Sequence, residues 1–210
     1  MLTKSSNICL LKMGEVRVMS KVIYVTGAPA AGKSSTLQAL RARIPGMEVW
    51  EYGERLTSYV RARSIDLVDQ SELRAKSAQV VTPDDIVQLD GQLLEFVELR
   101  RGKVPVLIDS HPVTKEEYGF RITAFSENRV RDLAPDEIWV FFTSPEETRR
   151  RIQSESGGRP LPSEEEARMH TSLQASIAAT YGIIVGAPVY LFDTAIDQET
   201  LLSRLTRRFE

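Results

Sequence analysis

Residues 22–36 read VIYVTGAPAAGKSST, in which β-favouring residues lead into a turn of glycine, proline and alanine and then into a lysine. Within this stretch, GAPAAGKS at 27–34 matches the pattern G-x-x-x-x-G-K-[ST]. Between a strand and a helix, the pattern predicts a loop whose backbone N–H groups and following helix N-terminus surround a phosphate. We call residues 27–34 the phosphate loop. A βα turn that binds nothing is the alternative.

Three residues of the phosphate loop have specific expected tasks. Gly27 and Gly32 permit a tight turn and a close approach of the backbone to the ligand. Lys33 is expected to reach the β- and γ-phosphates of a nucleotide. The hydroxyl of the next residue, Ser34, is expected to ligate Mg²⁺. These tasks predict a nucleoside triphosphate with Mg²⁺ as the bound group.

Composition limits the classes of protein that the chain can belong to. Its 210 residues suit one domain, and its net charge of -2 provides neither a basic surface for nucleic acid nor attraction to anionic lipid. Cys9 is the only cysteine, so no intrachain disulfide forms. No apolar stretch approaches the roughly 18 residues of a membrane span. We expect a cytoplasmic protein with no nucleic-acid or membrane partner.

The first twenty residues differ from the rest of the chain. Residues 1–20 contain a short apolar patch at 8–11 that Lys12 interrupts, which is too short for the apolar region of a signal peptide. Two interpretations remain open, a dispensable extension and a short structured arm. We expect residues 21–210 to form the single domain.

Five short runs of β-branched and aromatic residues predict strands, at 21–26, 47–52, 104–109, 137–143 and 188–192. Most of these runs do not alternate between polar and apolar residues, which is typical of a parallel sheet covered on both faces. Helix-like stretches lie between them. We therefore expect a three-layer α/β/α fold of the P-loop NTPase type with a five-stranded parallel sheet.

Two of the expected helices have clear starting signals. Thr82 precedes a proline and two acidic residues, which is the pattern of an N-cap followed by a favourable first turn. Ser163 and Glu166 form an S-x-x-E capping box that predicts a helix extending to about Tyr181, with Gly182 just past its end.

The third predicted strand ends in an acid. VPVLIDSH places Asp109 at the carboxyl edge of the sheet, where α/β folds bind ligands. Asp109 is therefore expected to hold Mg²⁺, directly or through water, together with Ser34. The alternative is that Asp109 only caps the segment that follows. His111 is expected either to contact the phosphate acceptor or to be a hydrogen-bonded loop residue.

Arginines gather around a break in a predicted helix that begins at Pro145. Guanidinium groups suit the negative charge that spreads over a phosphoryl group in transfer, and a glycine-hinged loop can close over a nucleotide. We therefore expect a lid at about 153–162. The alternative is a solvated helix face in which Glu146 and Glu147 pair with arginines at i,i+4. The arginines concerned are Arg149, Arg150, Arg151 and Arg159, and the break is at 157–158.

At this point the chain resembles a known family, the archaeal-type adenylate kinases, which are P-loop nucleoside monophosphate kinases. The resemblance covers about residues 21–192. It rests on VTGAPAAGKSST, VLIDSHPVTKEEYGF, the arginine helix with its short lid, and IAATYGIIVGAPVYLF. It implies transfer of the γ-phosphate of ATP to AMP with Mg²⁺ and without a covalent enzyme intermediate. It is also compatible with a homo-oligomer.

The resemblance further implies roles for individual residues. Lys33, Asp109, Arg150 and Arg159 would serve catalysis, the two arginines as lid residues. The neighbouring Arg149 and Arg151 are alternatives to Arg150. Arg74 would contact the acceptor phosphate, with a solvent-facing charge as the alternative. The acceptor would lie between the segment 53–95 and the loop after Asp109. The residues implied to contact the donor nucleotide are Gly27, Ala28, Pro29, Ala30, Ala31, Gly32, Lys33, Ser34, Ser35, Gly186 and Ala187.

One departure from the family pattern leaves the acceptor open. The loop near the acceptor base is rich in glycine and proline in the family, whereas here it reads GFRITAFSENR. The acceptor is therefore AMP, a monophosphate with another base, or a different small metabolite. A regulatory nucleotide-binding protein is a further alternative, which the lack of an N-K-x-D-like base-reading motif in the sequence disfavours.

Overall fold

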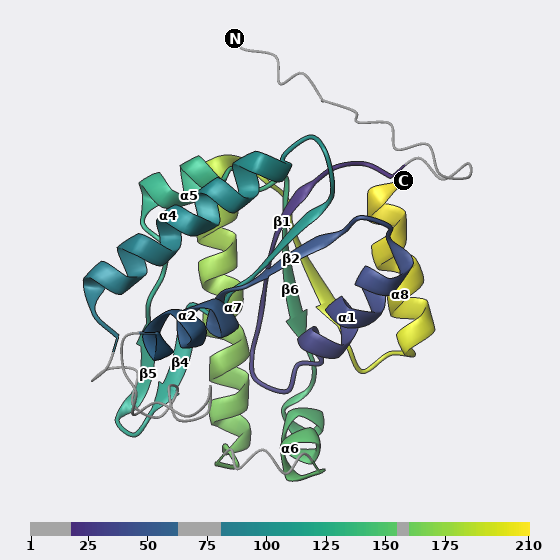
Figure 1. Cartoon of the computed structure of the whole chain (residues 1–210). Coiled ribbons are helices and arrows are strands. Elements are labelled where there is room, and N and C mark those ends of the chain that lie inside the picture. Colours follow the sequence, from purple (N-terminus) through teal and green to yellow (C-terminus); the bar gives the residue numbers. More distant parts are fainter. Residues whose placement is uncertain (1–17, 63–80, 155–159) are drawn as a thin grey trace.

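The computed structural model describes residues 18–62, 81–154 and 160–210, and its centre is a five-stranded parallel sheet (Figure 1). The strand order is β2-β3-β1-β6-β7, and every neighbouring pair in it is parallel. The expected α/β fold with five parallel strands is thereby confirmed. The strands are β1 (Val22–Gly27), β2 (Glu48–Glu51), β3 (Val106–Asp109), β6 (Glu137–Phe142) and β7 (Val189–Asp193).

Helices cover both faces of the sheet, as Figure 1 shows. On one face lie α1 (Lys33–Arg43) and α8 (Gln198–Thr206), which a short 3₁₀ turn (Arg207–Phe209) extends. On the other face lie α4 (Pro83–Arg100), α5 (Glu127–Leu133) and α7 (Glu164–Val185). Two shorter helices follow strands, α2 (Tyr52–Arg61) after β2 and α6 (Pro145–Ser154) after β6.

The continuous apolar sequence of β1 is explained by its burial on both faces. Val22 and Tyr24 pack in the core under α4, α5 and α7, while Ile23 and Val25 pack in the core under α1 and α8. A central parallel strand meets helices on each side, so consecutive residues must all be apolar. Burial of such side chains supplies the main favourable free energy of folding.

The two predicted helix starts are confirmed as capping boxes. Thr82 accepts a hydrogen bond from the backbone N–H of Asp85, whose carboxylate accepts one from the backbone N–H of Thr82. Ser163 and Glu166 make the same reciprocal pair at the start of α7. Each box gives hydrogen-bond acceptors to two backbone N–H groups at the start of its helix.

The predicted end of α7 is wrong by one turn. The helix continues through Gly182 to Val185, and Gly186 closes it with φ of 68°. Gly182 is needed for packing, since a Cβ there would lie 2.6 Å from Cγ2 of Val189 and 2.9 Å from the carbonyl oxygen of Ala187. Sequence alone does not distinguish a packing glycine from a helix-ending glycine.

A two-stranded antiparallel hairpin, β4 (Val113–Glu116) and β5 (Gly119–Ile122), follows β3 and was not predicted. Both strands have only four residues, and their sequence VTKEEYGFRI is too polar to resemble the buried strands. The hairpin follows β3 directly in the chain, so it lies beside the carboxyl edge of the sheet, where a ligand is expected.

A cluster of charged groups joins the beginning and the end of the described chain. Glu137 at the start of β6 accepts hydrogen bonds from Lys21 at 2.8 Å, from Arg208 at 2.9 Å and from the indole N–H of Trp139 at 2.9 Å. Met19 also donates its backbone N–H to the carbonyl of Phe209. Residues 18–20 are thus bound to the domain body, whereas residues 1–17 of the expected extension lie outside the described residues.

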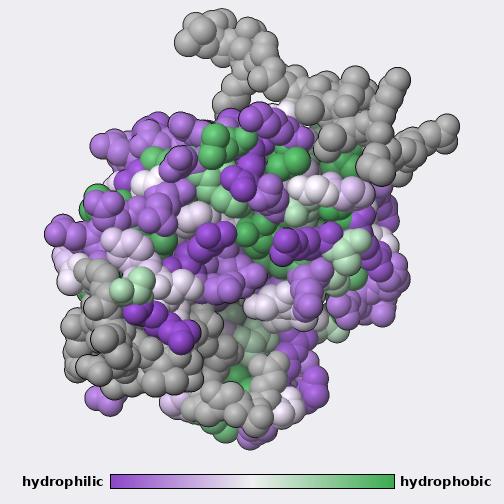
Figure 2. All heavy atoms as spheres, in the orientation of Figure 1, coloured by the Kyte–Doolittle hydropathy of each residue, from purple (hydrophilic) through white to green (hydrophobic). Residues whose placement is uncertain are grey.

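The visible surface is mostly hydrophilic, with smaller hydrophobic areas among the charged residues (Figure 2). None of the helices in the described part of the chain combines the length and the apolar character that crossing a bilayer requires.

Candidate active site

The phosphate loop joins the end of β1 to the start of α1, as predicted. Helix α1 begins at Lys33, so its N-terminal N–H groups point at the loop. Gly32 is the N-cap with φ of 70°, a left-handed conformation that glycine adopts at little cost. Ala30 has φ of 59°, which is uncommon for a residue with a side chain and indicates a constrained loop.

Lys33 and Asp109 form a buried ion pair at this edge of the sheet. Their side chains are only 4% and 8% exposed, and Lys33 Nζ donates to Oδ1 of Asp109. Asp109 ends β3, and its Cα partner in β1 is Val25, two residues before β1 ends at Gly27. The two residues that the sequence assigned to phosphate and metal are therefore in direct contact.

Oxygen atoms suitable for Mg²⁺ are present at the same edge. Ser34 is exposed in the first turn of α1, and Ser35 donates its hydroxyl to the carbonyl of Gly32 at 3.0 Å. Among residues 18–62, 81–154 and 160–210, no group of three or more His, Cys, Asp or Glu could hold a metal alone. A hydroxyl and a carboxylate fit Mg²⁺, which usually takes one or two protein ligands and completes its shell with phosphates and water.

His111 stands beside Asp109 rather than inside the core. Its Nδ1 lies 3.4 Å from Oδ1 of Asp109, and its side chain is partly exposed. The backbone N–H of Ser110 donates to the carbonyl of Val25, which fixes the loop after β3 against β1. His111 is therefore positioned to meet a ligand that approaches Asp109 from solvent.

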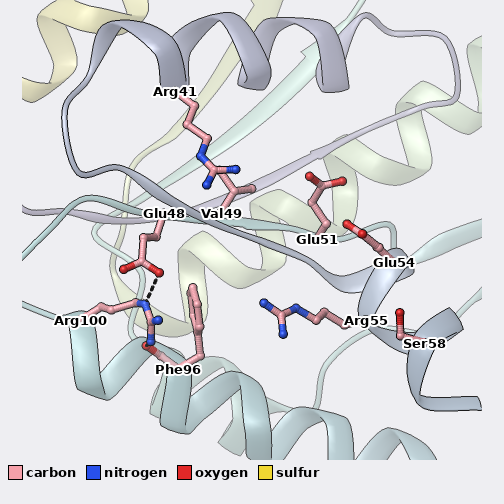
Figure 3. Close-up of a pocket in the computed structure, with 9 residues that line it drawn as sticks. All are labelled: Arg41, Glu48, Val49, Glu51, Glu54, Arg55, Ser58, Phe96 and Arg100. Atoms are coloured by element: carbon pink, nitrogen blue, oxygen red, sulfur yellow. Dashed lines mark hydrogen bonds and ion pairs between the residues drawn. The ribbon is translucent and has the colours of Figure 1, made fainter. Parts of the chain in front are cut away.

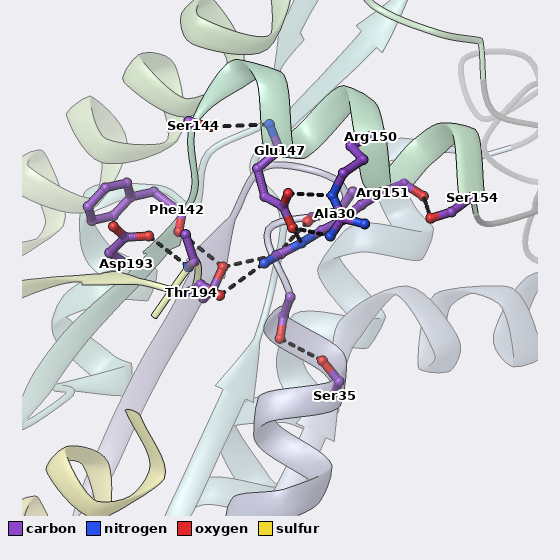
Figure 4. Close-up of polar contacts among 12 residues, drawn as sticks. Ala30, Ser35, Phe142, Ser144, Glu147, Arg150, Arg151, Ser154, Asp193 and Thr194 are labelled. Atoms are coloured by element: carbon purple, nitrogen blue, oxygen red, sulfur yellow. Dashed lines mark hydrogen bonds and ion pairs between the residues drawn. The ribbon is translucent and has the colours of Figure 1, made fainter. Parts of the chain in front are cut away.

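The arginines of α6 separate into one that contacts the phosphate loop and one that does not (Figure 4). Arg151 donates to the carbonyl of Ala30 at 3.2 Å, to Oγ1 of Thr194 at 3.0 Å and to the carbonyl of Thr194 at 2.9 Å. Arg150, whose side chain is 69% exposed, donates only to Glu147 within the described part of the chain. The helical register thus directs Arg151, and not the expected Arg150, at the nucleotide loop.

Glu147 holds both arginines in place. It accepts from Arg151 at i,i+4 and from Arg150 at i,i+3. Hydrogen bonds from Arg150 and then from Arg151 lower the pKa of Glu147 to about 2. The solvated ion-pair interpretation therefore applies to Arg150, while Arg151 adds contacts to the loop.

The expected lid lies only partly within the described residues. Arg159, the second expected lid arginine, lies outside them, as do residues 155–159 in general. Helix α6 ends at Ser154, and Arg149 donates to the carbonyl of Pro162 at 2.6 Å on the far side of the gap. Closure over a nucleotide stays a prediction.

The expected donor-base residues Gly186 and Ala187 lie at the wrong edge of the sheet. They precede β7, and β7 runs parallel to β6 and β1. Because they lead into the first residue of β7, they lie at the amino edge of the sheet, whereas the phosphate loop lies at the carboxyl edge. The segment after β7 reaches the phosphate loop instead, because Thr194 bonds to Arg151.

The segment expected to bind the acceptor follows the end of β2. Glu51 closes β2 and is the Cα partner of Asp109 in β3. Its carboxylate is exposed and does not cap α2, although Glu51 occupies the N-cap position. Burial, the charge of Asp109 and the charge of Glu54 raise the pKa of Glu51. Arg74, expected on the acceptor phosphate, lies outside the described residues.

A hydrogen-bonded group of side chains fixes α2 against α4 and α5. The hydroxyl of Tyr52 donates to Oδ1 of Asp90 at 2.8 Å, and Nε of Arg129 lies 3.4 Å from Oδ2 of Asp90. Burial raises the pKa of Asp90 and, with Asp90, the pKa of Tyr52. The start of α2, next to Glu51, is therefore held rigidly.

A second polar chain connects β1 to the hairpin. Thr26 donates to the side-chain oxygen of the fully buried Gln174, whose nitrogen donates to the carbonyl of Val113 at 3.4 Å. His170, one turn earlier on α7, lies 3.1 Å from the same carbonyl, and burial lowers its pKa. Neutral His170 and Gln174 together anchor the hairpin to the strand that carries the phosphate loop.

Known proteins resemble this chain over much of its length. A family model described as an AAA domain matches residues 26–168. The adenylate kinase of Pyrococcus abyssi is 22% identical over 182 residues, which are 86% of this chain and 89% of that protein. The guanylate kinase of Mycobacterium sp. (strain MCS) is 28% identical over 140 residues, which are 63% of this chain and 66% of that protein.

Solved structures support the fold. The deoxyadenosine kinase from M. mycoides with bound dATP has a TM-score of 0.52 at 12% identity, over 89% of this chain and 98% of that one. A sugar kinase from Janibacter sp. HTCC2649 has a TM-score of 0.51 at 14% identity, over 90% of this chain and 93% of that one. At these identities the likeness concerns the P-loop kinase architecture alone.

Sequence reasoning missed three residues at this edge. Arg151 was one of several adjacent arginines, and only the register of α6 selects it. Thr194 follows the last strand and has no distinctive motif. Glu51 did have a signal, because an acid at the end of a predicted strand was the reason for selecting Asp109.

Proposed function

The chain belongs to the AAA domain family, and from this membership we propose that it transfers the γ-phosphoryl group of ATP, with Mg²⁺, to a nucleoside or nucleotide. The single observation that carries the proposal is the buried contact between Lys33 and Asp109 at the mouth of the phosphate loop. A buried ion pair costs desolvation free energy, so its presence at a ligand edge favours a functional role over a stabilising one.

The residues of this edge divide the work of phosphoryl transfer. The N–H groups of the phosphate loop and α1 bind the phosphates, and Lys33 supplies a positive charge that a bound triphosphate draws away from Asp109. Ser34 and Asp109 are the residues that would hold Mg²⁺, which neutralises phosphate charge when bound. Arg151 keeps the carbonyl side of the loop in position, so that the N–H groups face the ligand.

The first candidate acceptor is the phosphate of a nucleoside monophosphate, with AMP tested before the others. The support is the likeness to adenylate kinases over most of both chains and the guanylate kinase relative. Arg74 and the lid arginine Arg159 would then bind phosphate groups. The nearby His111 would contact the acceptor.

The second candidate acceptor is a hydroxyl group, as in a nucleoside. It is favoured by one observation on this chain, the carboxylate of Glu51 at the end of β2 beside Asp109. A phosphate oxygen is already ionised at neutral pH and needs no base, whereas a hydroxyl must lose its proton.

One assay tests the proposed function. Purified protein with ATP and Mg²⁺ is incubated with a panel of nucleoside monophosphates and nucleosides, and the products are separated by chromatography. The proposal expects ADP together with one phosphorylated acceptor. Formation of neither ADP nor a phosphorylated product with any member of the panel would contradict it.

A further inference from the structure

Glu51 occupies the third of three adjacent positions at the carboxyl edge of the sheet. Val25, Asp109 and Glu51 are Cα partners in β1, β3 and β2. Partners in register on parallel strands point to the same face of a sheet. Val25 packs in the core beneath α1, so this is the face on which Lys33 begins α1.

The carboxylate of Glu51 has no structural role in the described part of the chain. Across residues 18–62, 81–154 and 160–210, its carboxylate makes no hydrogen bond or ion pair, and it does not cap the helix that it precedes. It is nevertheless close enough to Asp109, Lys33 and Arg41 for their charges to act on it. An acid without a structural partner, next to a buried catalytic pair, is available for a ligand.

A groove gives a small molecule access to Glu51. Along the free edge of β2, between α1, α2 and α4, the surface is hollowed by a pocket of about 520 Å³. Figure 3 shows Glu51 and Glu54 at one end of this groove, and Glu48 with Arg100 at the other. Arg55, between them, lies 4.8 Å from the ring of Trp50 and packs on it.

The groove carries charges of both signs, because Arg41, Arg55 and Arg100 line it together with Glu48, Glu51 and Glu54. Only direct contact with Glu51 disfavours an anionic acceptor. Glu51 and Glu54 line one end of the groove, and Asp109 lies behind them. A monophosphate placed against Glu51 would meet like charges, which weaken its binding. A neutral hydroxyl meets no such repulsion and can donate a hydrogen bond to the carboxylate.

We infer that Glu51 is a catalytic residue that accepts the proton of an acceptor hydroxyl, so that the acceptor is an alcohol, such as a nucleoside or a sugar, and not a monophosphate. The inference rests on the proposed phosphoryl transfer at Lys33. The position and chemistry of Glu51 favour a hydroxyl over a phosphate as the acceptor.

The transfer step balances without any further reagent. The acceptor O–H bond breaks and its proton passes to an Oε atom of Glu51. The acceptor oxygen forms a bond to the γ-phosphorus of ATP, while the bond from that phosphorus to the β,γ-bridging oxygen breaks and ADP leaves. Glu51 then returns the proton to solvent, and nothing is oxidised or reduced.

The test compares Glu51→Gln with Glu98→Gln, which removes an exposed carboxylate of α4 that does not line the groove. Each variant and the wild type receive ATP, Mg²⁺ and one acceptor from three sets: common ribo- and deoxyribonucleosides, hexoses, and nucleoside monophosphates. Rate constants and KM values are measured separately for acceptor and ATP, and binding of ADP with Mg²⁺ reports intact folding.

We expect the wild type to phosphorylate a nucleoside or hexose. Glu51→Gln should lower kcat for it at least 100-fold, the lower end of the range for general-base catalysis, with little change in KM for ATP. Glu51→Asp should recover part of the rate, and Glu98→Gln should stay within threefold of the wild type. Transfer to monophosphates alone, or a Glu51→Gln variant with the wild-type rate, would overturn the inference and leave the proposed function standing.

Hydrolysis of ATP gives a test of Glu51 that does not depend on the acceptor panel, because water is itself a hydroxyl acceptor. Hydrolysis of ATP without any other acceptor should fall at least tenfold in Glu51→Gln and stay unchanged in Glu98→Gln. Equal hydrolysis in wild type and Glu51→Gln would contradict the role of Glu51. Absence of ATP turnover in every protein, with wild type and Lys33→Ala alike, would instead reject the proposed function and the inference with it.

Discussion

Arg151 and its neighbour Arg150 provide a direct test of how α6 meets the phosphate loop. Replacing Arg151 with Ala removes a guanidinium whose Nη atoms donate to Ala30 and Thr194. Replacing Arg150 with Ala removes an equal charge one residue earlier, where the side chain is 69% exposed and donates to Glu147. The pair of variants separates the geometry of α6 from its net charge.

The expected magnitude follows from the contacts of Arg151. A hydrogen bond from a charged group is worth about 1.5 to 3 kcal/mol. The bonds to Ala30 and Thr194 hold one rigid group and are not additive, so we take about 3 kcal/mol in total. If that free energy holds the loop in its nucleotide-binding form, kcat/KM for ATP falls about 100-fold in Arg151→Ala. Arg150→Ala should change it less than threefold.

The assay measures ADP formation at varied ATP with saturating acceptor, and a thermal unfolding scan of each variant accompanies it. Arg151→Lys should recover little, because an ammonium group cannot reach the carbonyls of Ala30 and Thr194 with the planar fork of a guanidinium. The reasoning is refuted if Arg151→Ala stays within threefold of the wild type, or if Arg150→Ala loses as much activity.

Three further changes have definite expected outcomes. Asp109→Asn should raise the Mg²⁺ concentration needed for half-maximal activity, and a Mg²⁺ titration that matches the wild type would show that Asp109 is only structural. Glu137→Gln should lower the free energy of unfolding by about 2 kcal/mol at pH 7, less than for a fully buried pair because Lys21 and Arg208 are partly exposed. Burial raises the pKa of Glu137, but hydrogen bonds from Arg208, Lys21 and Trp139 bring it below 4.5. The contribution of Glu137 to the free energy of unfolding should therefore be complete above about pH 4.5 and disappear as pH falls through the lower pKa of the folded state. In urea unfolding, the stabilities of wild type and variant should differ at pH 7 and converge at pH 3. Gly182→Ala should destabilise the fold by about 2 kcal/mol through contact with Val189, and a variant as stable as the wild type would contradict the packing that explains the length of α7.

Sequence patterns sufficed where a local rule determines the structure. The strand–turn–helix setting of the phosphate loop, the five strands, the N-cap at Thr82 and the capping box at Ser163 each depend on a few neighbouring residues, and all of them are confirmed. Because consecutive βα units build a parallel sheet, the strands alone also placed Asp109 at the edge where Lys33 lies. This part of the site could therefore be predicted before any coordinates were known.

Features that depend on packing between distant segments could not be predicted. Gly182 resembles a helix-ending residue in sequence, and only its contact with Val189 explains why α7 continues. Gly186 and Ala187 were assigned to the donor base from a motif, although the direction of β7 puts them at the opposite edge from Lys33. The sequence could have excluded this assignment, because both residues precede a strand predicted to be parallel to β1 and so lie at the amino edge.

The arginines of α6 show that the sequence does not determine which face of a helix packs against its neighbours. Adjacent residues on a helix differ in direction by about 100°, so one of three consecutive arginines faces the phosphate loop while another faces solvent. Their sequence is uniform, and the outcome depends on how α6 packs next to Thr194. Glu51 is a different case, since an acid at the end of β2 could have been selected by the reasoning that selected Asp109.

The central claim is that this edge of the sheet transfers the γ-phosphoryl group of ATP through Lys33. Its most direct test is ³¹P NMR of ATP, Mg²⁺ and the acceptor panel, with wild type and Lys33→Met compared at equal concentration after circular dichroism has shown equal secondary structure. We expect the wild type to convert ATP into ADP and a phosphorylated acceptor, and Lys33→Met to do so at least 100-fold more slowly, which corresponds to about 3 kcal/mol of lost transition-state stabilisation. A wild type that forms no phosphorylated acceptor, or a folded Lys33→Met variant that forms it at the wild-type rate, would contradict the claim.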